Sequence, residues 1–355
     1  MESIGKNYQS AWLGEKGAEW LFILLVPILT SLSVIIFEDY FENQTDVNSL
    51  WWIILVMGVD VSHVYSTLYR TYFDSKEFNA NRTLYTYTPA ICLVLMIVFY
   101  QIHPMAFWRC LAYLAVFHFI RQQYGFMRLY ARNEPPNGLN RYLSTAVIYA
   151  VVLYPIIFWH LQPGRTFSWF ISGDFLIGSQ PIILSICFYL YLSILSSYCL
   201  YTTYMSIHHR QFNLPKNLII LGSAISWYVG IVAYNGDLIF TLLNVLSHGV
   251  PYMALIWIYG KKQHKNSQEM GVSFLFKNVA IPIFIGLLLL FAYVEEGLWD
   301  ALVWRDHPEF FGLFSSLPQQ THATLLSIII PLLSLPQVTH YVLDAFIWKV
   351  RKMDV

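Results

Sequence analysis

The chain has 355 residues, of which 57% are hydrophobic and only 12% are charged, and its 21 basic and 21 acidic side chains cancel. Soluble domains carry about 25% charged residues, so the composition excludes a soluble domain and predicts a membrane protein. The balanced charge offers no basic surface, and we expect no nucleic-acid partner. The four cysteines lie in apolar stretches without a CxxC pair, so we interpret them as small hydrophobic side chains.

The apolar residues gather in segments of the length that crosses a bilayer as a helix, about 20 residues. They predict an all-α, polytopic integral membrane bundle of about ten transmembrane helices, which forms a single transmembrane domain over residues 1–355. The expected helices cover residues 18–37, 50–69, 87–102, 105–127, 143–161, 179–207, 217–234, 237–259, 273–294 and 322–348.

The charges in the connecting loops alternate along the chain. Loop 38–49 holds four acidic residues and no basic one, loop 70–86 holds three basic residues, and residues 261–265 read KKQHK, whereas residues 295–321 are mainly acidic. Cytoplasmic loops of membrane proteins are enriched in Lys and Arg. The pattern therefore predicts cytoplasmic termini, and we expect the protein in a bacterial inner membrane.

The expected helices that run toward the cytoplasm carry histidines together with other polar residues. Residues three or four apart share one helix face, so each such pair can point at one target. Three of these histidines lie roughly 17–20 Å below the outer boundary, just inside the cytoplasmic half of the membrane. The pairs are Asp60 with His63, His118 with Gln122, His208 with His209, Asn244 with His248, and His340 with Asp344.

A shared metal explains several histidines at similar depth better than separate hydrogen bonds do. Imidazole and carboxylate ligands favour one or two iron ions, with zinc or a b-type haem as alternatives. We expect His63, His118, His248 and His340 as ligands, and Asp344 as a ligand or as a catalytic group that orients a histidine. His208 and His209 are further candidate ligands, which an interfacial position explains equally well. Tyr124 is a candidate proton donor, and Asp60, Gln122 and Asn244 are candidates for contacts to the ligands.

The stretches SHVYS, HFIRQQYG, HHRQF and HGVPYM place isolated histidines at four points along the chain. This succession resembles the bacterial membrane β-carotene dioxygenase family, whose members are polytopic and bind non-haem iron through histidines. The resemblance covers a few residues at each point. It implies membrane-embedded iron that activates O₂ against a hydrophobic molecule.

The sequence thus favours a membrane oxygenase, desaturase or hydroxylase that acts on a lipid-like substrate among the membrane lipids. No flavin, nucleotide or ferredoxin motif is present, so such an enzyme needs an external electron donor. A proton- or ion-coupled transporter is the main alternative, since buried Asp and His also form proton relays. A b-type haem electron carrier is a third reading. Within the histidine-bearing helices, Pro251 is expected to break or kink the helix after His248.

Overall fold

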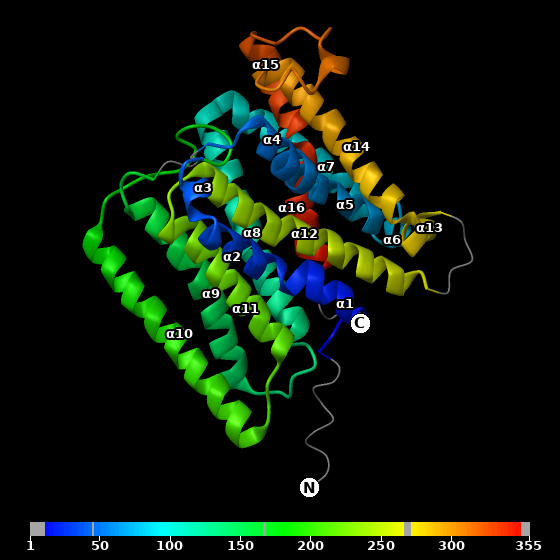
Figure 1. The fold of residues 1–355 in the computed structure, drawn as a ribbon. Helices are drawn as coiled ribbons and strands as arrows, with labels where there is room; N and C mark the ends of the chain where they lie inside the picture. The colour runs from blue at the N-terminus through cyan, green and yellow to red at the C-terminus, as the bar shows by residue number, and fades with distance from the viewer. Residues whose placement is uncertain (1–10, 45, 166–167, 266–270, 349–355) are drawn as a thin grey trace. The chain divides into compact units, whose positions relative to one another are not determined.

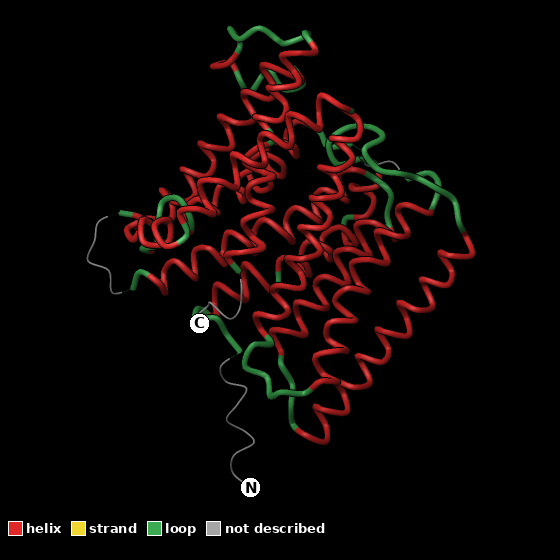
Figure 2. Tube along the Cα trace, turned by 180° about the vertical axis from the view of Figure 1, so that it is seen from behind, coloured by secondary structure: helices red, strands yellow, loops and turns green. Residues whose placement is uncertain are grey.

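The computed structural model describes residues 11–44, 46–165, 168–265 and 271–348, and every regular element in these ranges is a helix (Figure 2). Eight of the described helices are long and apolar enough to cross a membrane, or nine if one bent pair counts as a span. The all-helical, polytopic fold is therefore confirmed. The predicted positions of both chain ends fall on residues 1–10 and 349–355, outside the described residues.

The chain forms two compact units. The first consists of Met1–Val47, Ala115–Ala254 and Trp348–Val355, and the second of Asn48–Leu114 and Leu255–Ile347. Two long helices, α8 and α12, carry residues of both ranges. Their bounds are Pro104–Tyr130 and Asp237–Gln263.

In the first unit α9 is the central helix, since it packs against both α10 and α11, and α11 in turn packs against α2. Figure 1 shows α9, α10 and α11 side by side. Most of α10 is exposed and apolar, as a helix that faces lipid would be. The helices of this unit are α1 Lys16–Glu19, η1 Trp20–Leu24, α2 Val26–Ile36, α3 Glu38–Glu42, α9 Gly138–Leu161, α10 Pro181–His209, α11 Leu214–Trp227 and η3 Tyr228–Ala233.

In the second unit α5 packs against both α14 and α16. It continues a π-helical segment, η2, and α4 into one span, Ser49–Arg70. The helices are α4 Ser49–Trp52, η2 Ile53–Val61, α5 Ser62–Arg70, α6 Ser75–Ala80, α7 Arg82–Ile102, α13 Val272–Leu275, η4 Asn278–Ala280, α14 Ile281–Trp299, η5 Asp300–Trp304, η6 Gly312–Phe314, α15 Ala323–Leu333 and α16 Leu335–Ile347.

The predicted spans differ from the observed helices in two places. The first span, 18–37, is a pair of helices bent by 43°. The segment predicted at 105–127 is the continuous helix α8, but it contains Arg109, Arg121 and Arg128 and is not among the spans that meet the apolar criterion. The prediction of about ten spans thus exceeds the eight or nine found in the described residues.

One expectation about a helix end was wrong. Residues 295–304 were expected in an acidic outer loop, but α14 and η5 carry the span to Trp304. At α14 a hydrogen bond from Tyr65 on another helix compensates one of the carboxylates that indicated a loop. Pro251, where a break or a kink is expected, lies inside α12, which is not broken there and runs to Gln263.

The packing of α12 on Phe276 leaves no space for a side chain at Gly260. A Cβ at this position would collide with the ring of Phe276, which is buried and stacks on His264. We expect Gly260→Ala to lower the free energy of unfolding by about 1–3 kcal/mol, the usual cost of overpacking. Thermal unfolding in detergent checks this value. Gly286→Ala in α14 is the matched control, because no atom lies within 4 Å of the added Cβ, and an equal loss in both variants would contradict the assignment.

Candidate metal centre

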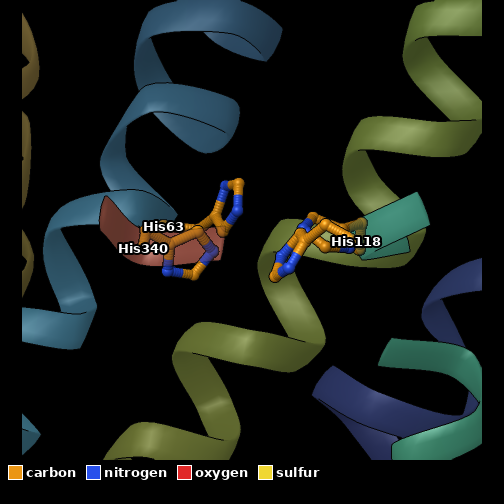
Figure 3. A group of neighbouring side chains, drawn as sticks. His63, His118 and His340 are labelled. Carbon is orange, nitrogen blue, oxygen red and sulfur yellow. The ribbon is translucent and has the colours of Figure 1, made fainter. Parts of the chain in front are cut away.

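The first histidine pair lies inside the second unit, where α5 packs against α16. His63 and His340 are 1% and 2% exposed, and their ring centroids lie 5.0 Å apart at an interplanar angle of 80°. Figure 3 shows the two imidazoles next to one another. The π-helical segment η2 ends two residues before His63, and such wide turns are common at functional sites.

Both rings of this pair turn their Nδ1 atoms toward polar groups of the same unit. The Nδ1 of His340 lies 2.7 Å from the hydroxyl of Thr67 and 3.8 Å from Asp344. The Nδ1 of His63 lies 3.6 Å from Asp60. The hydrogen bond between Thr67 and the Nδ1 of His340 fixes the plane of that ring and leaves its Nε2 as the atom for a metal.

The second pair lies inside the first unit and consists of His118 on α8 and His248 on α12. Their ring centroids are also 5.0 Å apart, at an angle of 78°. The ring of Phe119 stacks on His248 at 3.6 Å and 10°, and Gln122 donates a hydrogen bond of 2.8 Å to the backbone carbonyl of His248. The stacked ring and the amide hold His248 in place without occupying its ring nitrogens.

The four histidines of the two pairs are all buried and lie close together. Each offers one ring nitrogen, and these four atoms lie within 4.8 Å of one another. Neutral imidazole is the commonest metal ligand in proteins, and four nitrogens at this spacing can hold a metal ion. The group consists of the four histidines that the sequence predicts as ligands, three of which Figure 3 labels.

The other candidates from the sequence lie around these pairs or apart from them. Asp60 and Asp344 lie on the Nδ1 sides of His63 and His340, and Asn244 donates to the carbonyl of Phe240 in its own helix. Tyr124 stacks on Tyr149 and lies under the guanidinium of Arg121.

The paired histidines of α10 occupy a different kind of position. His208 and His209 are exposed at the end of that helix and lie against Tyr204. Among the described residues, the group that can hold a metal does not include them.

Three contacts of this region, two of them polar, were missed by sequence reasoning. Thr67 lies one helical turn after His63, so the spacing alone could have suggested it. Phe119 gives no signal, because aromatic residues are common in every span. Glu295 accepts a hydrogen bond of 2.5 Å from Tyr65 on α5. A carboxylate inside a span is costly unless it is paired in this way, which explains why the sequence indicated a loop there.

Thr67 provides a direct test of the ring orientation. Thr67→Val keeps the shape of the side chain but removes the group that faces His340 Nδ1. We expect the metal dissociation constant to rise by about 10–100-fold, as for other residues that orient a ligand. Competition with a chelator measures the constant. Thr71→Val is the control, since the Thr71 hydroxyl donates a hydrogen bond of 2.8 Å to the backbone carbonyl of Thr67. The metal dissociation constant of this variant should equal that of the wild type.

No protein-family model, curated protein or solved structure matches this chain. The fold and the site define the class by themselves. The protein is an integral membrane protein of the all-α polytopic class, with four buried histidines that can hold a metal ion.

Proposed function

We propose that the protein is a membrane-embedded, iron-dependent oxidoreductase that uses O₂ to oxidise a hydrophobic, lipid-like substrate. The observation that carries the proposal is the group of four buried histidine nitrogens within 4.8 Å of one another. Each buried polar side chain in a membrane protein costs free energy, so four at one place favour a functional ligand. The resemblance of the histidine-bearing stretches to the β-carotene dioxygenase family supports the same chemistry.

The donor set suits iron, and its geometry supports a single ion more than two ions or a haem. Imidazoles suit iron, zinc and copper(II), whereas copper(I) prefers sulfur. Asp60 and Asp344 lie at the Nδ1 sides of histidines, where they orient ligands, so the set supports one ion more than a carboxylate-bridged pair. In each pair the rings lie 5.0 Å apart at a steep angle, an arrangement for converging on one ion rather than for flanking the plane of a haem.

Iron supplies the redox centre that lets O₂ react with an otherwise inert hydrocarbon. The chain's own residues hold and shield that centre. The hydrogen bond with Thr67 fixes the His340 ring, Phe119 fixes the His248 ring, and the low exposure of all four histidines excludes water. The reducing equivalents come from an external donor, and the enzyme operates in a bacterial inner membrane with both termini in the cytoplasm.

Oxygen uptake tests this function against its rivals. The purified protein, loaded with iron and supplied with a chemical reductant, should consume O₂ faster when an extract of membrane lipids is added. His118→Ala should lose this lipid-dependent uptake. Lipid-independent uptake in both proteins would contradict the oxidoreductase, and a Soret band would indicate the haem carrier instead. A wild-type protein that binds no metal would favour the transporter.

A further inference from the structure

The second unit contains a polar pocket of about 360 Å³ that the proposed metal centre does not use. It lies where α5 ends and α6 begins, beside the last turn of α12. Its volume is in the range of pockets that hold small molecules. Its lining consists of Arg70, Asp74, Lys76, Glu77, Tyr259, Gln263 and His264.

Arg70 is held rigidly in the wall of this pocket. It is only 9% exposed, its Nη2 donates a hydrogen bond of 2.6 Å to the carbonyl of Ile347, and its guanidinium lies 3.9 Å from the ring centroid of Tyr259. A planar guanidinium whose orientation is fixed in this way is suited to carboxylate and phosphate groups.

The two acidic residues of the pocket are engaged by neighbouring groups. Asp74 caps α6 through the N–H groups of Lys76 and Glu77, and its other oxygen lies 3.2 Å from the Nε2 of His264. The hydrogen bond with His264 holds the pKa of Asp74 below its usual range. Glu77 accepts from Asn81 at 2.9 Å and from Tyr85 at 2.7 Å. Both carboxylates are thus engaged in hydrogen bonds within the protein, and the wall also includes the cations Arg70 and Lys76.

The pocket is connected to the His63–His340 pair by two helices. Arg70 follows His63 by seven residues on α5, and Ile347 follows His340 by seven residues on α16. Seven residues are two helical turns, or about 10 Å along the axis. The hydrogen bond from Arg70 to Ile347 joins the ends of these two helices. A headgroup in the pocket would therefore place the first part of an attached hydrocarbon chain within reach of the histidines.

We propose that this pocket binds the anionic headgroup, a carboxylate or a phosphate, of a single-chain amphiphile whose apolar tail extends toward His63 and His340. The role of the tail as the oxidised part rests on the proposed function, whereas binding of the headgroup does not. The proposal narrows the substrate class from any lipid-like molecule to an anionic amphiphile.

Binding is measured by native mass spectrometry of the full chain in a nonionic detergent, with dodecanoate, dodecyl phosphate, dodecanol and inorganic phosphate as probes. At least one of the two anionic amphiphiles should bind at least tenfold more tightly than dodecanol, and inorganic phosphate more weakly than dodecyl phosphate. Whichever anion binds identifies the headgroup. Dodecanol that binds as tightly as both anions would overturn the headgroup claim, and equal affinity for both phosphates would overturn the role of the tail.

Charge reversal locates the binding to the pocket. Lys76→Glu should weaken binding of the anionic amphiphile at least fivefold and leave dodecanol unchanged. Lys262→Glu, which changes an exposed lysine outside the lining, is the matched control. Arg70→Gln should weaken binding further, provided that its unfolding temperature shows a folded protein. Equal effects of Lys76→Glu and Lys262→Glu would overturn the assignment.

A separate variant distinguishes this proposal from the proposed function. His63→Ala should lose the metal but keep the affinity for the anionic amphiphile. Binding of the amphiphile by a wild-type chain that holds no metal would support the pocket and contradict the oxidoreductase alone. Loss of metal in His63→Ala together with no effect of Lys76→Glu on binding would contradict the pocket alone.

Discussion

Replacing His118 or His340 by alanine is expected to reduce bound metal to less than about a tenth of the wild-type content. Each substitution removes one of four ring nitrogens that lie within 4.8 Å of one another. An ion with three remaining ligands in a closely packed interior gains no replacement from water, because His118 and His340 are 5% and 2% exposed. The content is measured by elemental analysis after purification under identical conditions.

Two further substitutions make this test specific. His209→Ala and His322→Ala change exposed histidines outside the four-histidine group, and both should keep the full metal content. Unfolding temperatures measured in the presence of a chelator separate loss of metal from loss of folding. Full metal occupancy in both His118→Ala and His340→Ala would show that the metal lies elsewhere. A loss of metal in His209→Ala would show that the end of α10 contributes to the metal site.

The largest effect on stability is expected at a buried ion pair of the first unit. Lys216 is 3% exposed, and its Nζ lies 2.8 Å from Glu134 and 3.3 Å from both Asn140 and Ser144. Asn213 donates a hydrogen bond of 2.9 Å to the same carboxylate. Glu134→Ala leaves the ammonium of Lys216 buried without its counter-charge, so we expect a loss of about 3–5 kcal/mol in the free energy of unfolding.

A double-mutant cycle separates the pair from its surroundings. Adding Lys216→Met to Glu134→Ala should recover most of the loss, since replacing both charges by apolar groups is often neutral. Glu309→Ala is the surface control, because its carboxylate is half exposed and lies 4.0 Å from His307, and it should change stability by less than about 0.5 kcal/mol. A loss in Glu134→Ala as small as in the control would contradict a buried, structurally important pair.

The sequence predicted the part of the site that repeats along the chain and missed the part that depends on neighbours. The four ligand candidates stand out because a histidine in an apolar span is costly and because the spans alternate in direction. Thr67 contacts His340 only because α5 packs against α16. The ring of Phe119 on α8 likewise stacks on His248, which belongs to another helix. No spacing within one helix encodes those contacts.

The ends of helices were harder to predict for a related reason. The carboxylates of α14 resembled a loop because their compensation comes from another helix, where Tyr65 donates to Glu295. Pro251 indicated a break because proline lacks the N–H group of a helical hydrogen bond, which the sequence shows directly. The helix α12 nevertheless continues through this position. Overall class and histidine pattern follow from local rules, and the remaining geometry follows from tertiary contacts.

X-ray absorption at the iron edge on the purified wild-type protein tests the central claim most directly. We expect about one iron per chain, with a first shell dominated by imidazole nitrogen and no sulfur, as the four histidines of the group predict. A protein that is folded and monodisperse but binds no metal in stoichiometric amount, or whose metal has a sulfur or haem environment, would contradict the account.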